Sequence, residues 1–179
     1  MSERSFDVVV IGAGPAGEVC AGRLADAGLE VVVVEQHLVG GECSFYGCMP
    51  SKALLRPGQL LAEARRVPGA AQAVDGLDVR AALERRDEII NHLHDDNQTP
   101  WLEAHGIALA RGHGRITGER TVQVGNETLA ARRAVVIATG TEPILPPIPG
   151  LREARPWTNR EAVTAKEVPP SLVVLGGGT

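Results

Sequence analysis

The chain has 179 residues, enough for one domain and the start of another, and its 44% hydrophobic and 22% charged content is that of an ordinary globular protein. A net charge of −4 and an aromatic content of 3% argue against nucleic-acid binding, which needs a basic surface and stacking side chains. No apolar run reaches the roughly 18 residues needed to cross a bilayer, and the first residues lack the apolar core of a signal peptide. We therefore expect a cytoplasmic protein with no membrane association.

The first expected unit is a buried strand, a glycine-rich turn and a helix. Residues 7–11 read Asp-Val-Val-Val-Ile, a run typical of a strand that is buried on both faces of a parallel sheet. Residues 12–17 read Gly-Ala-Gly-Pro-Ala-Gly, and the helix that follows this turn is expected to end at Gly28. A second buried strand over residues 31–34 leads directly into Glu35.

This order of elements is the context that the dinucleotide-binding fingerprint requires. Gly12 permits the tight turn, Gly14 lets the backbone approach a pyrophosphate, and Gly17 lets the helix pack on the strand. The helix N-terminus offers free N–H groups to phosphates, and Glu35 is placed to accept hydrogen bonds from ribose hydroxyls. The alternative is a glycine turn in another α/β fold, and the unit does not itself choose between FAD and NAD.

Two of the three cysteines, Cys43 and Cys48, are separated by four residues. A zinc site would need a closer pair and a second pair of ligands, and Cys20 lies inside the first helix, so no metal site is expected. Pro50 suits the first turn of a helix and places Cys48 near its N-terminus, where free N–H groups and Lys52 favour a thiolate. Cys43 would then be available for exchange with a substrate disulfide, whereas the alternative is a pair of inert buried cysteines.

Residues 40–52, which read GGECSFYGCMPSK, resemble the redox motif of the class I pyridine nucleotide–disulfide oxidoreductases. This family includes dihydrolipoamide dehydrogenase, glutathione reductase and mercuric reductase. The resemblance implies that Cys43 is the interchange thiol, that Cys48 is the flavin-facing charge-transfer thiol, and that Lys52 lies near the reactive edge of the isoalloxazine. Glu42 replaces a threonine that normally touches the cofactor, and residues 44–46 replace a segment that usually contains Leu and Asn.

Helices and short strands are predicted for the middle of the chain. A helix over residues 52–66 is expected to kink or split at Pro57. A long charged helix is expected to begin after the N-cap residue Asp78 and to present apolar residues as far as Leu93, with Pro100 ending or bending it. Short strands follow over residues 107–110, 121–124 and 128–132, the last two joined by a hairpin turn.

A second flavin motif is expected near residue 140. Residues 135–140, Val-Val-Ile-Ala-Thr-Gly, predict a buried strand ending in small residues, which let backbone approach a cofactor, and they resemble the family's second FAD motif. Gly114 matches a family position whose backbone contacts adenine. A stiff proline-rich connector leads to residues 171–178, which repeat the pattern of a strand running into glycines and resemble the start of the family's NAD(P)H domain.

The resemblance implies an α/β fold: a Rossmann-like, three-layer FAD-binding domain with a parallel sheet, helices and a small antiparallel β-meander. We expect this domain, with its redox-active disulfide, over residues 1–150. A connector and the first strand of a truncated NAD(P)H-binding domain are expected over residues 151–179. The residues expected to bind FAD are Gly12, Gly14, Pro15, Ala16, Gly17, Glu35, Gln36, Gly41, Glu42, Cys48, Lys52, Gly114, Ala138, Thr139 and Gly140.

The activity that the resemblance implies is reduction of a small-molecule disulfide, with electrons passing from NAD(P)H through FAD to the Cys43–Cys48 disulfide and on to the substrate. The resemblance covers only the front part of the family enzyme, so we expect a fragment that lacks normal turnover by itself and a homodimer in the full-length form. Two alternatives stay open. One is a flavoprotein that transfers electrons to quinones or between nicotinamides without needing the cysteines, and the other is a non-enzymatic redox sensor.

Overall fold

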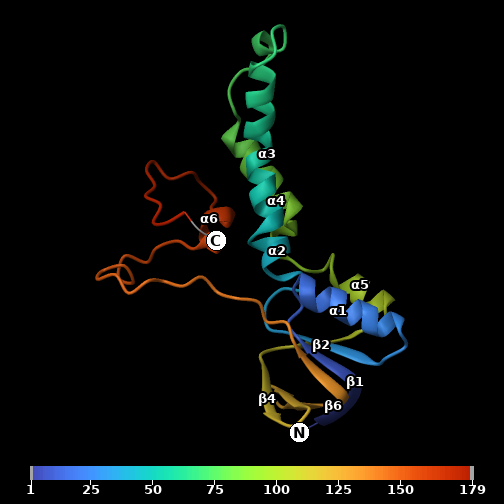
Figure 1. The fold of residues 1–179 in the computed structure, drawn as a ribbon. Coiled ribbons are helices and arrows are strands. Elements are labelled where there is room, and N and C mark those ends of the chain that lie inside the picture. The colour runs from blue at the N-terminus through green and yellow to red at the C-terminus, as the bar shows by residue number, and fades with distance from the viewer. Residues whose placement is uncertain (1, 178–179) are drawn as a thin grey trace.

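The computed structural model describes residues 2–177, which form one six-stranded sheet with helices packed against it (Figure 1). The strand order is β3-β2-β1-β6-β5-β4, with parallel pairing from β3 to β6 and antiparallel pairing from β6 to β4. The strands are β1 (Ser2–Ile11), β2 (Val31–Glu35), β3 (Ala108–Arg111), β4 (Gly114–Gly118), β5 (Thr121–Val124) and β6 (Glu127–Ile137). The predicted α/β fold, with a parallel sheet and a small antiparallel meander, is confirmed.

The helices cover one side of the sheet and also build a separate projection. They are α1 (Pro15–Asp26), α2 (Gly41–Phe45), α3 (Cys48–Arg65), α4 (Val79–Ile89), α5 (Thr99–Ala104) and α6 (Asn159–Thr164), with the 3₁₀ helices η1 (Ala71–Ala73) and η2 (Asn91–Leu93). In Figure 1, α1 and α5 lie beside the sheet, whereas α3 and α4 pair and extend away from it. Within residues 2–177, no helix combines the length and the apolar character that crossing a membrane requires.

The two faces of the parallel sheet are both covered, which explains why its central strands are apolar at successive positions. Val10 on one face packs in a buried cluster with Ala21 of α1 and Leu102 of α5. Val9 on the opposite face packs in a second cluster with Val122 of the antiparallel meander. Every residue of β2 is buried, as the unbroken valine run predicts. The core therefore lies in two layers, one on each side of β1 and β2.

The first predicted unit is confirmed, but the prediction of two separate strands near residues 128 and 135 is wrong. α1 begins directly after the glycine turn, and Gly28, with a φ of 82°, follows its end. β6 is one strand because it pairs with β1 along most of its length and with β5 over its first part. Its last residue, Ile137, is 67% exposed, so this end of β6 is not buried as predicted.

The helix predicted to follow Asp78 is shorter than expected. Asp78 caps α4 as predicted, since its side chain accepts a hydrogen bond from the Ala81 N–H at 2.9 Å. The helix ends at Ile89 because residues 91–93 all take left-handed φ values, which break the helical hydrogen-bond pattern. Pro100 lies in the first turn of α5, where its missing N–H has no partner to lose, so it helps to start a helix rather than to end one.

α3 runs through Pro57 without the predicted split. A proline inside a helix removes the N–H that would bond to the carbonyl four residues earlier, which here belongs to Ala53. Nη1 of Arg85 in α4 donates to this carbonyl oxygen at 3.2 Å and replaces the missing donor. Packing against α4 therefore compensates the proline, and the local sequence pattern does not reveal this contact.

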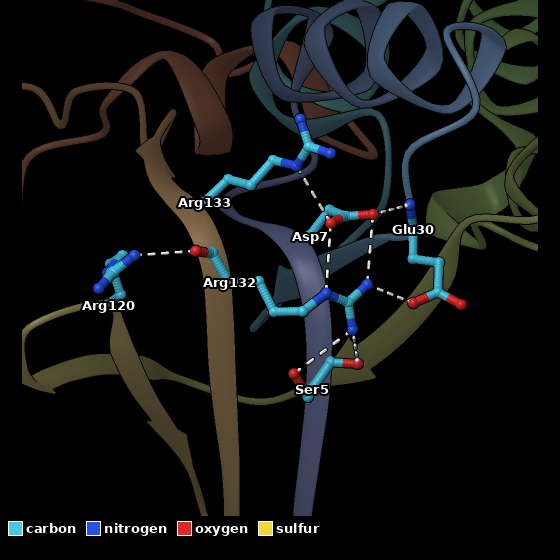
Figure 2. Close-up of polar contacts among 6 residues, drawn as sticks. All are labelled: Ser5, Asp7, Glu30, Arg120, Arg132 and Arg133. Carbon is cyan, nitrogen blue, oxygen red and sulfur yellow. Dashed lines mark hydrogen bonds and ion pairs between the residues drawn. The ribbon is translucent and has the colours of Figure 1, made fainter.

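A cluster of charged side chains joins β1 and β6 to the residue that precedes β2 (Figure 2). Arg132 donates through Nε to Oδ1 of Asp7 at 3.2 Å and also forms an ion pair with Glu30. Oδ2 of Asp7 accepts the Glu30 N–H at 3.0 Å, and Arg133 donates to Oδ1 at 3.2 Å. Asp7 lies where the pairing of β1 with β6 shifts its register, so the cluster fixes the two strands at an irregular point.

We expect the Asp7 cluster to make folding stability depend on acid pH. Hydrogen bonds from Arg132 and from the Glu30 N–H lower the pKa of Asp7 from its ordinary value of 3.8 to about 2. Because the folded-state pKa is the lower one, the ionised carboxylate stabilises the fold above about pH 4, and this contribution is lost as the pH falls from 3.8 towards 2. Asp7→Asn should lower the free energy of unfolding at neutral pH and flatten its pH dependence in this window.

Urea unfolding of the wild type and Asp7→Asn, repeated at pH values from neutral to about 2, measures this effect. Asp75→Asn is the control, because the Asp75 side chain is outside the cluster. The same pH dependence in Asp7→Asn and in the wild type would contradict the prediction.

Residues 171–177 form no strand, although the sequence predicts one. Val173 is 83% exposed and Leu175 is 66% exposed, and no strand within residues 2–177 pairs with this segment. A parallel strand needs a neighbour for its N–H and carbonyl groups, so the apolar pattern alone does not form one. Gly176 has a φ of 92°, similar to the 103° of Gly12 in the first glycine turn. Met1, Gly178 and Thr179 lie outside the described residues, so the last part of this motif does as well.

Candidate functional site

A cavity of about 280 Å³ lies at the carboxyl ends of β1, β2 and β6. In the sheet order, β2 lies on one side of β1 and β6 lies on the other, so the direction of the chain through the sheet switches at this point. Doubly wound sheets bind their ligands at such a switch point, outside the carboxyl ends of the strands. The walls come from the segments that follow these three strands, from residues 112–114 and from α6.

Most of the residues predicted to bind FAD line this cavity. They are Gly12, Gly14, Pro15, Ala16, Glu35, Gln36, Gly41, Glu42, Gly114, Ala138, Thr139 and Gly140. Gly17, Cys48 and Lys52 do not line it, and neither does Cys43. Lys52 instead lines a separate groove between α3 and α4, together with Met49.

Close backbone contacts hold the glycine turn against the end of β6. Gly12 has a φ of 103°, and a Cβ at this position would lie 2.3 Å from the carbonyl oxygen of Ala138. A Cβ on Gly17 would lie 1.9 Å from the carbonyl oxygen of Gly12. Real Cβ atoms do not approach backbone atoms so closely, so both positions require glycine. Gly17 thus acts beneath the cavity by bringing α1 onto the turn, which agrees with the packing role predicted for it.

The carboxylate of Glu35 is fixed at the cavity wall by two backbone hydrogen bonds. Its Oε2 accepts the Ala13 N–H at 2.8 Å, and its Oε1 accepts the His37 N–H at 2.7 Å. The side chain is 9% exposed and lines the cavity. Each oxygen retains a second lone pair. Glu35 can therefore still accept a hydrogen bond from a ribose hydroxyl while it holds the glycine turn at Ala13 and the backbone at His37, just after β2. The bonds within the protein were not predicted from the sequence.

Asp95 supports the wall that follows β2. Its carboxylate accepts the Val39 N–H at 2.7 Å and pairs with Arg111 at 2.7 Å, and Arg111 also donates to the His37 carbonyl at 3.1 Å. Burial by itself would raise the pKa of Asp95, but the hydrogen bonds from Arg111 and from the Val39 N–H leave it lowered. The ionised Asp95 carboxylate, together with Arg111, therefore holds the backbone between Glu35 and Val39 in place.

The two cysteines lie on adjoining helices next to the cavity. Cys43 is half-buried in α2, and Cys48 is exposed at the first position of α3, as predicted; both are free thiols in this structure. The neighbouring Cys48 thiol, followed by burial, raises the pKa of the Cys43 thiol, while the positive charge of Lys52 opposes the shift. The two thiols thus lie on neighbouring helical turns at a helix N-terminus and near a cation, an arrangement suited to thiol–disulfide exchange.

Helix α6 contributes a cavity-lining residue that was missed in the sequence, Arg160. Thr158 caps this helix, and Glu161 completes a capping box by bonding back to the Thr158 N–H at 2.7 Å. The pattern Thr158-x-x-Glu161 was therefore a readable signal for a helix start. The position of this helix beside the cavity had no local signal.

Side chains of α6 contact two residues near the cysteines: Glu42, which precedes Cys43, and Tyr46, which lies between Cys43 and Cys48. Nε of Arg160 donates to Oε1 of Glu42 at 2.6 Å, and Nδ2 of Asn159 donates to Oε2 of Glu42 at 2.9 Å. Asn159 also donates to the Tyr46 carbonyl at 2.9 Å, and the Arg160 guanidinium lies over the Tyr46 ring, 4.8 Å from its centroid. Glu42, which replaces the family's threonine, is therefore paired with a cation.

The residues of the cavity fit a dinucleotide such as FAD. The N-cap residue Gly14 makes no side-chain cap, so N–H groups in the first turn of α1 are available to a pyrophosphate beside the cavity. Glu35 provides an acceptor for ribose hydroxyls. At Gly114 a Cβ would lie 3.1 Å from the side chains of Ile11 and Val34, a tight contact that favours glycine in this wall of the cavity. Among residues 2–177, no group of three or more His, Cys, Asp or Glu side chains is placed to hold a metal ion.

Comparisons with known proteins show the family to which the chain belongs. A family profile described as pyridine nucleotide-disulphide oxidoreductase matches residues 6–179. The chain is 32% identical to a mercuric reductase of Staphylococcus aureus over 97% of its own length and 32% of that protein's. It is 31% identical to a dihydrolipoyl dehydrogenase of Acholeplasma laidlawii over 98% of its own length and 54% of that protein's.

A solved structure shares the fold. The Cu(II) complex of the HOCl-induced flavoprotein disulfide reductase RclA from Escherichia coli superposes with a TM-score of 0.73 at 26% identity, over 92% of this chain and 35% of that one. The chain thus spans about a third to a half of the length of these relatives. FAD and NAD(P)H are the cofactors of the family that the profile describes. The chain belongs to the pyridine nucleotide-disulphide oxidoreductase family.

Proposed function

We propose that this chain forms the flavin-binding and dithiol-bearing part of an NAD(P)H-dependent disulfide reductase similar to dihydrolipoamide dehydrogenase. The observation that carries the proposal is the placement of Cys43 in α2 and Cys48 at the start of α3, on either side of the segment that borders the dinucleotide cavity. A flavoprotein that did not use its cysteines would not need two free thiols on adjoining helices at this position. We assign the FAD-binding unit to residues 1–150 and the connector with the start of an NAD(P)H-binding unit to residues 151–179.

The cavity residues would bind and orient FAD. The first turn of α1 would hold the pyrophosphate, Glu35 a ribose, and the backbone around Gly114 the adenine. When it is bound, FAD supplies the chemistry that links a two-electron donor, NAD(P)H, to a dithiol. Lys52 lies one helical turn after Cys48, and its positive charge opposes the rise in the pKa of the Cys43 thiol.

The two cysteines would reduce the substrate by two successive exchanges. The Cys43 thiolate attacks one sulfur of the substrate disulfide, a Cys43–substrate bond forms, and the first substrate thiol leaves. The Cys48 thiolate then attacks Sγ of Cys43, which releases the second substrate thiol and closes the Cys43–Cys48 disulfide. The substrate gains two electrons and two protons, and the cysteine pair loses two electrons. The dithiol would be regenerated with two electrons and two protons, the electrons supplied by NAD(P)H when FAD is bound.

The whole protein would act as a cytoplasmic homodimer on a small-molecule disulfide. The proteins similar to this chain include a dihydrolipoyl dehydrogenase and a mercuric reductase. A catalytic cysteine pair suits a reducing compartment, in which disulfides serve catalysis rather than structure.

The test is disulfide reduction by the full-length protein with Cys43 replaced by serine. Serine cannot form the mixed disulfide, so we expect Cys43→Ser to lower NAD(P)H-dependent reduction of lipoamide by about a thousandfold or more while bound flavin is retained. Cys20→Ser, a half-buried cysteine in α1, is the matched control and should leave the rate unchanged. Undiminished nicotinamide oxidation with quinone acceptors in Cys43→Ser, without disulfide reduction by the wild type, would instead favour electron transfer independent of the cysteines.

A further inference from the structure

Carboxylates outnumber the permanently cationic side chains on the wall of the cavity. Glu35, Glu42 and Glu142 line it, whereas Arg160 is its only arginine or lysine within residues 2–177. A pyrophosphate adds two further negative charges. The N–H groups of α1 favour an anion, but a carboxylate on the wall of the same cavity opposes it. An anionic ligand therefore needs at least one of these carboxylates to be neutralised.

Glu42 is the carboxylate whose charge is cancelled. Oε1 of Glu42 accepts from Nε of Arg160 at 2.6 Å and is ion-paired with the same guanidinium, while Oε2 accepts from Asn159 at 2.9 Å. Both side chains are 35% exposed, so solvent screens the pair only in part. The face of the guanidinium is covered by the Tyr46 ring. Arg160 is thus committed to Glu42 and Tyr46 rather than left free for a ligand.

The other end of α6 is anchored independently. Arg86 of α4 is fully buried and donates through Nη2 to the Ala165 carbonyl at 2.7 Å, and it also bonds to the Val163 carbonyl. Lys166 pairs with Asp87 at 2.9 Å. Contacts with α4 therefore fix the helix that presents Arg160, so the guanidinium is held beside Glu42 from two directions.

We infer that Arg160 is a positioning residue that compensates the charge of Glu42 and thereby lets the cavity accept the pyrophosphate of FAD. The inference rests on the proposed function for the identity of the ligand. It assigns to residues 151–179 a part in the cofactor site, beyond the connector role given to them above. It also predicts a specific coupling: Arg160 is required because Glu42 is present.

The experiment is a double-mutant cycle on FAD affinity, measured by titrating the purified apoprotein and following flavin fluorescence. Arg160→Gln leaves the Glu42 charge uncompensated and should weaken FAD binding about tenfold, with a smaller loss at high salt. Glu42→Gln should bind FAD at least as well as the wild type. The double variant should return to within about twofold of the wild type. Arg152→Gln, on the same segment but outside the cavity, is the control and should have no effect.

Each other outcome has a definite meaning. An Arg160→Gln affinity equal to that of the wild type, or a double variant as weak as Arg160→Gln alone, would overturn the inference, because Glu42 would then not be the reason for Arg160. If Arg160→Gln does not fold, Arg160→Lys keeps the charge and should bind FAD nearly normally, and tenfold weaker binding by this folded variant would also overturn it. A wild-type protein that binds no FAD would remove the proposed cofactor site itself, a failure that the variants are not needed to detect.

Discussion

Replacing Gly17 with alanine is expected to destabilise this protein by about 3 kcal/mol or more and to abolish FAD binding. The new Cβ would lie 1.9 Å from the Gly12 carbonyl oxygen and 3.5 Å from the Ala138 side chain. To relieve the first contact, α1 must move away from the glycine turn. That movement would open the buried cluster that Val10 shares with Ala21 and would displace the helix N-terminus that borders the cavity. Denaturant unfolding and flavin titration of the variant measure the two consequences.

Gly58→Ala is the matched control, since it makes the same substitution in a helix where nothing lies within 4 Å of the added Cβ. Because alanine is the better helix former, this variant should be more stable than the wild type by about 0.5–1 kcal/mol and should bind FAD normally. The opposite signs of the two changes separate crowding at the turn from a general effect of glycine replacement. A Gly17→Ala protein as stable as the wild type would show that the contact beneath the turn is not essential.

The parts of the fold that the sequence predicts are those determined by local pattern. The two valine runs predict β1 and β2 because a strand buried on both faces has no polar positions. The glycine turn predicts the start of α1, and Asp78 predicts the start of α4, because a turn and a cap depend on neighbouring residues alone. These local features place most of the predicted FAD-binding residues on the cavity wall.

The parts that the sequence does not predict depend on contacts between distant segments. Arg85 supplies the donor that lets α3 pass Pro57, from 32 positions away. Arg160 reaches Glu42 across 118 positions. Neither contact has a periodic or motif signal, so their residues look like ordinary surface charges in the sequence. The predicted strand over residues 171–175 fails for the opposite reason: its pattern is correct, but no described strand is available to pair with it.

Arg86→Met should have the second large effect, a loss of about 3 kcal/mol in the free energy of unfolding. The Arg86 side chain has no exposed surface, and it donates to Oδ1 of Asp87 at 3.0 Å as well as to the Val163 and Ala165 carbonyls at the C-terminal end of α6. Methionine fills a similar volume but leaves both carbonyls and part of the Asp87 carboxylate without a donor. We expect α6 to detach first, which hydrogen exchange over residues 158–166 detects.

Lys166→Met is the control, because Lys166 pairs with the same Asp87 carboxylate but its side chain is 70% exposed. An exposed ion pair contributes less than about 1 kcal/mol, so this variant should unfold nearly as the wild type does and should keep α6 protected. If Arg86→Met were equally mild, the buried guanidinium would not be what holds α6 in place. If it releases α6 as expected, Arg160 loses its fixed position, and FAD affinity should fall by about the same factor as in Arg160→Gln. A loss of affinity that arises from a residue outside the cavity would show that α4 supports the cofactor site through α6.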